Sequence, residues 1–220
     1  YMSNPLKENE WRDIFNKLID SLEQANQSIY LQITRGVSRR DHDISIADKP
    51  TVFAMSRPLE TNNFSSGIKA ITHEDIRWQL CNIKAITLLP SILLRNKAKE
   101  QEARETILIR DKYVTEGAAS NVFVCTDDKI LTPPRTSHVL SGITRDLIVE
   151  ILMHNDLPIV EGSISESKLL SAGEIWVTSS TWEIVPVVEL DNKLVSSGMP
   201  GPLWRQANKL YQDFKNDYCG

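Results

Sequence analysis

A single lysine interrupts an apolar stretch of this chain. Lys84 lies between Ile83 and Ala85 in the run CNIKAITLLPSILL, residues 81–94. A lysine in such a run either extends its ammonium group to water or is desolvated, and desolvation lowers the pKa of the amine. A neutral amine is a nucleophile that forms a Schiff base with an aldehyde. The spacing alone favours the lysine that reaches water.

Two further segments combine hydroxyl groups with backbone N–H groups that could bind an anion. SGITRD, residues 141–146, predicts a helix whose first N–H groups belong to Ile143 and Thr144. A helix start attracts a phosphate dianion, although a plain capped helix is the simpler interpretation. VTSSTWEI, residues 177–184, ends an apolar strand with the hydroxyl residues Thr178, Ser179, Ser180 and Thr181. These hydroxyls could complete a phosphate site or turn in solvent.

Charged side chains supply the remaining candidates. Glu116, in VTEGAASN, stands beside small residues that let it approach a ligand, where it could hold a pyridine nitrogen protonated. The alternative is a surface carboxylate in a turn. Arg40 and His42 follow a predicted strand in RGVSRRDH, and an arginine binds a carboxylate through two hydrogen bonds. A solvated basic loop is the alternative. The other histidines have no metal-ligand spacing, so we expect no metal site.

Composition excludes several classes of function. The chain has 220 residues, of which 41% are hydrophobic and 25% charged, with a net charge of -4. Acidic and basic residues are mixed, which disfavours binding to nucleic acid or an anionic membrane. Three widely spaced cysteines predict reduced thiols. No apolar run is long enough to span a bilayer and the start resembles no signal peptide, so we expect a cytoplasmic protein.

The elements that must position these residues form a mixed α/β or α+β chain. Hydrophobic periodicity predicts helices over residues 5–26, 87–103, 141–155, 165–172 and 203–214. It predicts strands over residues 29–35, 51–56, 68–78, 157–164, 174–180 and 184–190, with a strand, a loop and a hairpin over 114–132. A stretch rich in Pro, Asn, Ser and Gly, residues 57–67, predicts a linker. We therefore expect two domains, 1–59 and 60–220.

The order of these motifs resembles the fold-type IV pyridoxal-phosphate aminotransferases. The resemblance rests on YLQITRG with RRDH, DIRWQLCNIKAITLL, VTEGAASNVF, LSGITRD and VTSSTWEI, and it runs over nearly the whole chain. The word C-x-IK and the R-x-H after TRG point to the D-amino acid branch of the family. The fold implied is a two-domain fold with a shortened small domain at residues 1–59 and a large cofactor-binding domain at 60–220.

The resemblance also implies a role for each candidate residue. Lys84 would hold pyridoxal phosphate and move the proton at the substrate Cα, and Glu116 would pair with the pyridinium nitrogen. The other cofactor-binding residues would be Leu140 against the ring, with Ile143, Thr144, Ser180 and Thr181 around the phosphate. The substrate carboxylate would be bound by Arg40 and His42, with Tyr30 near them.

The reaction implied is the transfer of the amino group of a D-amino acid such as D-alanine to 2-oxoglutarate. The family also implies a homodimer, because the loop with Arg40 and His42 reaches the neighbouring subunit. We expect a preceding segment of the family to be missing from this sequence. Alternatives within the fold are a branched-chain aminotransferase and a 4-amino-4-deoxychorismate lyase. The alternative outside it is a truncated binding module without catalytic activity.

Overall fold

A computed structural model describes residues 2–24, 26–43, 49–59, 63–127 and 129–219. The chain divides into two compact units, Tyr1–Thr61 and Asn62–Gly220. The boundary that we expected from the sequence lay at residues 59–60. Within the described residues, no helix is both long enough and apolar enough to cross a membrane.

In its described residues, the first unit contains one helix and one antiparallel pair of strands. The helix is α1 (Glu8–Asp20), and the strands are β1 (Gln27–Thr34) and β2 (Thr51–Pro58), with Thr34 opposite Thr51. The helix begins three residues later than predicted, because the side chain of Glu10 accepts a hydrogen bond from the Lys7 N–H at 2.8 Å. Strand β2 extends two residues into the predicted linker.

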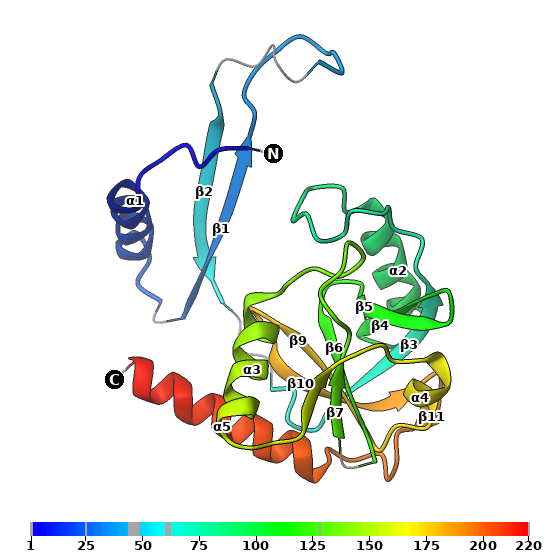
Figure 1. Ribbon diagram of the computed structural model, residues 1–220. Coiled ribbons are helices and arrows are strands. Elements are labelled where there is room, and N and C mark those ends of the chain that lie inside the picture. The colour runs from blue at the N-terminus through cyan, green and yellow to red at the C-terminus, as the bar shows by residue number, and fades with distance from the viewer. Residues whose placement is uncertain (1, 25, 44–48, 60–62, 128, 220) are drawn as a thin grey trace. The chain divides into compact units, whose positions relative to one another are not determined.

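The second unit is built on a curled sheet of nine strands among the described residues (Figure 1). The strand order is β5-β4-β3-β10-β9-β6-β7-β8, and β11 pairs with β10. Only the pairs β3–β4, β3–β10 and β7–β8 are parallel. The strands are β3 (Ile68–Glu74), β4 (Glu105–Arg110), β5 (Tyr113–Gly117), β6 (Asn121–Thr126), β7 (Lys129–Thr132), β8 (Ile159–Glu161), β9 (Glu174–Ser179), β10 (Glu183–Leu190) and β11 (Lys193–Leu194).

Side chains from the central strands are buried on both faces of the sheet. In β6, Val122 and Val124 belong to one hydrophobic core, whereas Phe123 and Cys125 belong to the other, as the alternation of a strand requires. The second core also receives the apolar faces of α3 (Ile143–His154) and α5 (Pro202–Cys219). The helices α2 (Leu89–Glu100) and α4 (Glu166–Leu170) complete the unit.

A buried carboxylate fixes the start of α5. The Glu174 side chain accepts hydrogen bonds from the Leu203 N–H at 2.9 Å and the Trp204 N–H at 2.8 Å. It also accepts one from the indole N–H of Trp176 at 3.1 Å. Because the first N–H groups of a helix have no partner within the helix, Glu174 serves as the cap of α5 from a neighbouring strand.

The predicted mixture of helices and strands is confirmed, with differences at several boundaries. Strand β4 was missed. The strand predicted over 68–78 ends at Glu74, because the next residues form a buried ionic cluster described below. The helix predicted over 87–103 is shorter at both ends, and the final helix is longer than predicted.

Candidate functional site

Glu116 lies near the end of β5 and is 4% exposed. Its Oε2 accepts hydrogen bonds from the Leu140 N–H at 2.9 Å and from Asn121 Nδ2 at 3.1 Å. Its Oε1 accepts from the guanidinium of Arg77. Glu116 is therefore a buried carboxylate with hydrogen-bond partners on both oxygens, not the solvent-exposed turn residue that its local pattern also allowed.

Arg77 connects Glu116 to a second buried carboxylate. Its Nε lies 2.9 Å from Asp75 Oδ1, and its NH2 donates to Asp75 Oδ2 at 2.9 Å and to the His138 carbonyl at 3.2 Å. Arg110 pairs with Asp75 at 3.3 Å. Two guanidinium groups thus balance two carboxylates, which is how buried charges persist in a protein interior. We call Asp75, Arg77, Arg110 and Glu116 the ionic cluster.

The cluster sets the protonation of both carboxylates. Burial raises the pKa of Glu116 to about 7, although the opposing charge and hydrogen bond of Arg77 lower it. Asp75 behaves differently: burial tends to raise its pKa, but the hydrogen bonds and charges of Arg77 and Arg110 prevail, and the pKa is lowered. The pKa values of two carboxylates that share one arginine are therefore shifted in opposite directions.

The start of α3 lies next to Glu116 through the backbone of Leu140. The Leu140 carbonyl accepts from Asn121 Nδ2 at 2.8 Å and from the Gly142 N–H at 2.9 Å. Gly142 is the N-cap residue of α3, and no side chain caps this helix end. Thr144 is buried, whereas Ile143 is exposed. The first-turn amides of α3 thus remain available for an anion close to a buried carboxylate.

The end of β9 borders the same place, with Thr178, one of the four hydroxyl residues that the sequence offered, rather than with the Ser180 and Thr181 that the resemblance implies. Asn121 lies opposite Thr178 in the antiparallel pairing of β6 and β9, so the two side chains share one face of the sheet. Thr178 Oγ1 is buried without a hydrogen-bond partner among the described residues. The predicted Ser180 and Thr181 follow the strand in an exposed turn. The Thr178 hydroxyl is accordingly a candidate to hydrogen-bond to a ligand.

Lys84 lies in the loop between β3 and α2, and it is exposed. Ile83 and Ala85 are half-buried, so the flanking residues turn inward while Lys84 turns outward. Lys84 thus reaches water in the described chain, as its spacing alone favoured, and its role at the cofactor stays a prediction. The physical reason is that the segment is an irregular loop ahead of Leu89, where α2 begins, and only part of it is covered.

Three hydrogen bonds hold this loop to the segment that leads into α3. Asn82 donates its N–H to the Ser137 carbonyl at 3.2 Å. The Gln79 side chain lies 2.7 Å from His138 Nε2. The third is the bond from Arg77 to the His138 carbonyl. Lys84, Leu140 and Glu116 therefore lie on segments that are tied to one another.

The predicted substrate residues belong to the first unit. Tyr30 is exposed on β1, and its hydroxyl donates to Gln32 Oε1 at 2.7 Å. Arg40 and His42 are exposed in the loop after β1, and the His42 N–H donates to Asp41 Oδ1 at 2.7 Å. Their roles stay predictions.

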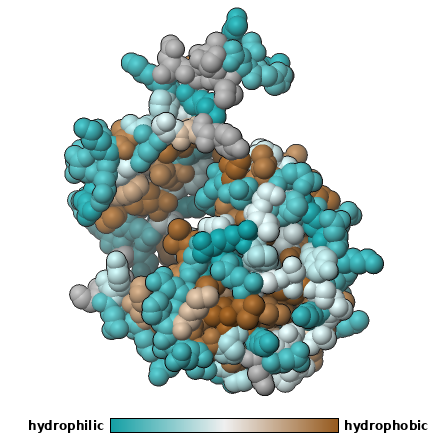
Figure 2. All heavy atoms as spheres, viewed as in Figure 1, coloured by the Kyte–Doolittle hydropathy of each residue, from teal (hydrophilic) through white to brown (hydrophobic). Residues whose placement is uncertain are grey.

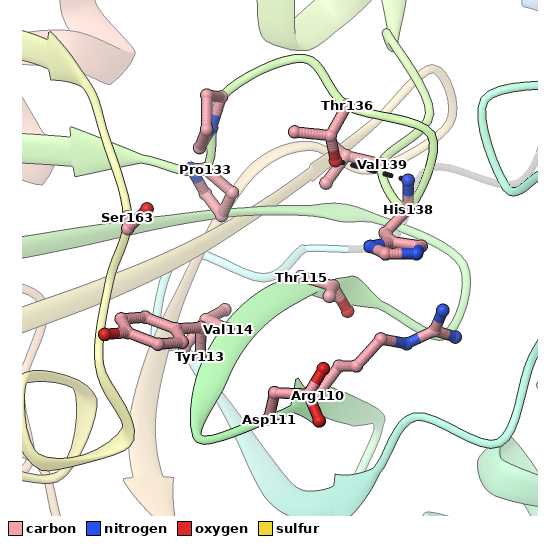
Figure 3. Close-up of a pocket in the computed structure, with 11 residues that line it drawn as sticks. Arg110, Asp111, Tyr113, Val114, Thr115, Pro133, Thr136, His138, Val139 and Ser163 are labelled. Carbon is pink, nitrogen blue, oxygen red and sulfur yellow. Dashed lines mark hydrogen bonds between the residues drawn. The ribbon is translucent and has the colours of Figure 1, made fainter. Parts of the chain in front are cut away.

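A cavity of about 230 Å³ is lined by Arg110 of the ionic cluster and by Thr115 and Val139, the chain neighbours of Glu116 and Leu140. Its walls come from the β4–β5 turn, the loop before α3 and Ser163, as Figure 3 shows. Arg110 and His138 face it, yet both already hold internal partners in Asp75 and Gln79. None of Lys84, Glu116 and Thr144 lines this cavity. The chemistry that we infer below does not depend on it.

The sequence analysis missed Arg77 and Asn121. Arg77 is separated from Glu116 by 39 positions, and it was assigned to a strand. The short spacing between Glu116 and Asn121 was visible in the quoted motif VTEGAASN. A polar amide between a small-residue loop and the apolar run VFVC was the available signal, since a buried amide needs partners.

Comparison with known proteins gives a consistent result. The family model for amino-transferase class IV matches residues 1–190. The D-alanine aminotransferase of Bacillus licheniformis is 36% identical over 208 residues, which is 94% of this chain and 74% of that protein.

Solved structures share the fold at low sequence identity. A branched-chain aminotransferase from Thermobaculum terrenum, in its PLP form, has a TM-score of 0.82 and 21% identity and covers 97% of this chain and 72% of its own. A protein from Legionella pneumophila proposed to be a 4-amino-4-deoxychorismate lyase has a TM-score of 0.86 and 17% identity, covering 96% and 78%. At these identities the likeness concerns the fold alone.

Proposed function

We propose, from the premise that this chain belongs to the aminotransferase class IV family, that it transfers the amino group of D-amino acids to 2-oxo acids. The enzyme class is a pyridoxal-phosphate-dependent aminotransferase. The proposed substrates are D-alanine and 2-oxoglutarate, which give pyruvate and D-glutamate. The substrate proposal is supported by D-alanine aminotransferases at 36% and 35% identity, whereas the branched-chain and lyase likenesses lie below 25%.

The observation that carries the proposal is the arrangement around Glu116. A buried carboxylate lies at one end, the uncapped start of α3 lies at the other, and Asn121 bonds to the segments of both. Thr178 adds a buried hydroxyl that has no partner in the described chain. These donors and acceptors fit pyridoxal phosphate, which needs an acceptor for its ring nitrogen and several donors for its phosphate.

Each predicted residue would have a separate role in binding the cofactor. Pyridoxal phosphate, when bound, supplies an aldehyde and a ring that takes up electrons. Glu116 would hold a proton at the ring nitrogen, and Arg77 would keep that carboxylate ionised and in place. Ile143 and Thr144 would donate N–H groups to the phosphate, together with Ser180 and Thr181, and Leu140 would pack against the ring.

Proton transfer at the substrate is assigned to Lys84. Lys84 is exposed on the loop between β3 and α2, which is tied to the segment that carries Leu140. In the neutral form it would take the proton from the substrate Cα and return it to the neighbouring carbon of the cofactor. The substrate carboxylate would be bound by Arg40 and His42, with Tyr30 alongside.

A homodimer is part of the proposal. Large apolar side chains are exposed along residues 76–93, which we call the 76–93 segment: Ile76, Trp78, Leu80, Ile86, Leu88, Leu89, Ile92 and Leu93. Figure 2 shows hydrophobic residues at the surface in this part of the second unit. An apolar surface of this extent marks an interaction site. A second copy of the chain is the proposed occupant.

Donor stereochemistry tests the proposed reaction. The purified chain, supplied with pyridoxal phosphate and 2-oxoglutarate, should form pyruvate from D-alanine and should not form a 2-oxo acid from L-leucine. Transfer from L-leucine alone would contradict the D-amino acid assignment. Release of pyruvate from aminodeoxychorismate without any 2-oxo acid would instead identify a lyase.

The role of Lys84 has its own spectroscopic check. Addition of pyridoxal phosphate should produce an absorption band at about 410 nm that borohydride removes. The Lys84→Ala variant should lack the band. The control variant Lys99→Ala, which removes an exposed lysine of α2, should retain it. A chain that stays colourless would support the alternative of a non-catalytic binding module.

A further inference from the structure

Asn121 is the side chain that connects the two ends of the proposed cofactor site. It is 7% exposed at the first position of β6. Its Nδ2 donates to Glu116 Oε2 at 3.1 Å and to the Leu140 carbonyl at 2.8 Å. Both hydrogens of the amide are thus used, one toward the carboxylate and one toward the chain that enters α3.

The other atom of the same amide sets how closely α3 can approach. A Cβ added to Gly142 would come within 2.2 Å of Asn121 Oδ1 and within 3.4 Å of its Cγ. Gly142 has an ordinary φ of -70°, so its backbone conformation does not require glycine. The reason for glycine here is the contact with Asn121, which packs directly against the N-cap of α3.

From these contacts we propose that Asn121 is a positioning residue that sets the separation between the Glu116 carboxylate and the first-turn amides of α3. The inference rests on the proposed function, because a separation has a use only for a ligand that engages both ends. Such a ligand carries a basic ring nitrogen at one end and a phosphate dianion at the other. By fixing this separation, Asn121 would let the carboxylate and the amides bind the two ends of one ligand at the same time.

This role differs from that of an ordinary buried anchor. An anchor that only holds the β5–β6 connection would, when removed, weaken every ligand of the site by a similar factor. A residue that keeps two binding elements in register would, when removed, reduce the advantage of a ligand that spans both. The distinguishing quantity is therefore a ratio of two affinities.

The experiment measures the affinity of the unloaded chain for pyridoxal phosphate and for pyridoxal, which lacks the phosphate. The wild type should bind the phosphorylated compound much more tightly. In Asn121→Ala that advantage should shrink by about tenfold or more, because the carboxylate and the amides no longer keep their separation. The isosteric Asn121→Asp should do the same, since it replaces the amide donor by a carboxylate facing Glu116.

A double-mutant cycle tests the contact with the helix. Gly142→Ala should lower the affinity for pyridoxal phosphate in the wild type, where the new methyl group meets Asn121 Oδ1. In the Asn121→Ala background the same change should cost little, because the obstructing amide is gone. The control is Asn155→Ala at the other end of α3, whose amide donates to the Ile151 carbonyl at 2.8 Å. It should leave the affinity ratio unchanged.

The outcomes separate this inference from the function on which it rests. Equal losses of affinity for the two compounds in Asn121→Ala, with circular dichroism unchanged, would overturn the positioning role and leave the function intact. Additive effects of Gly142→Ala and Asn121→Ala would also overturn it. A wild type that binds neither compound would overturn both the role and the proposed function.

Discussion

At the scale of single residues, Glu116 combines burial with ionic partners. Its carboxylate lies among Arg77, Asn121 and the Leu140 N–H, and the charged groups around it are Arg77, Asp75 and Arg110. Removing one partner of such a group costs about 3–5 kcal/mol, because an uncompensated buried charge remains. Arg77 is consequently as important for the integrity of this site as Glu116.

The pKa of Glu116 gives a prediction about pH and stability. Burial raises its pKa from 4.5 to about 7, so the folded chain retains a proton there that the unfolded chain releases. This difference in proton binding lowers the unfolding free energy of the wild type. The loss is absent below pH 4.5, grows as pH rises, and is complete above pH 7. The unfolding free energy of Glu116→Gln minus that of the wild type should therefore rise over this window, by on the order of 1–3 kcal/mol.

Urea denaturation at several pH values measures this difference. The pKa of Asp75 is shifted in the opposite direction, but Asp75 is present in both proteins. The exposed Glu150→Gln on α3 is the control and should change the unfolding free energy by less than about 0.5 kcal/mol. A difference between Glu116→Gln and the wild type that stays flat or falls with pH would contradict the prediction.

At the scale of elements, the sheet and the helices depend on a few side chains that reach from one element to another. Asn121 does so from β6 to α3, and Glu174 does so from β9 to α5. Each is a buried polar residue at the first position of its strand. Such residues serve as caps and spacers, because the ends of a helix leave backbone groups without partners.

We predict that Glu174→Ala destabilises the second unit by about 3 kcal/mol. The change removes the acceptor of two buried donors, the Trp204 N–H and the indole N–H of Trp176, and of the partly buried Leu203 N–H. Glu174→Gln should cost less, because one acceptor oxygen remains. Denaturant unfolding measures both, and Glu150→Ala on the exposed side of α3 is the control. Equal stability of Glu174→Ala and the wild type would contradict the capping role.

The elements also show what the sequence could predict. Hydrophobic alternation located β6, β9 and β10, and helical periodicity located α3 and α5, because each contributes a regular apolar face. Strand β4 was not predicted, since its first residues Glu105 and Thr106 are polar although they are buried. Their side chains bond outside the strand, Thr106 to the Leu94 carbonyl and Glu105 to the Ser120 hydroxyl.

The candidate site was predictable where chemistry follows from residue type. Lys84, Glu116 and Thr144 were singled out as an amine, a carboxylate and a helix start. Arg77 was not assigned a role, because its importance arises from tertiary contacts, and the sequence could not single out Thr178 among four neighbouring hydroxyl residues. The exposed state of Lys84 agrees with what the spacing alone favoured, since an apolar sequence flank does not guarantee that the flank covers the residue.

At the scale of the whole molecule, the second unit presents the 76–93 segment as an apolar surface that contains Lys84. Residues on both sides of the amine in the sequence thus form the proposed contact with a second copy. Assembly and catalysis would then depend on one stretch of chain. A change in this segment that prevents association should affect both properties.

We predict that Leu89→Lys lowers the molecular mass in solution from that of a dimer toward that of a monomer. Leu89 is 66% exposed at the start of α2, and a buried lysine would oppose association at an apolar contact. Light scattering coupled to size exclusion measures the mass. Met153→Lys is the matched control, because Met153 is 53% exposed on α3 outside the segment. A wild type that is monomeric at all concentrations would contradict the proposal.

The strand order of the second unit has a consequence for its synthesis. Strands β5, β4 and β3 join the rest of the sheet only through β10, and Thr72 in β3 hydrogen-bonds to Asp191, 119 residues later in the chain. A ribosome adding about 5–20 residues per second needs roughly 6–24 s for that interval. During it, one edge of β3 has no partner strand. The nascent chain therefore carries an open sheet edge until β10 has been made, and it is most vulnerable to aggregation during that interval.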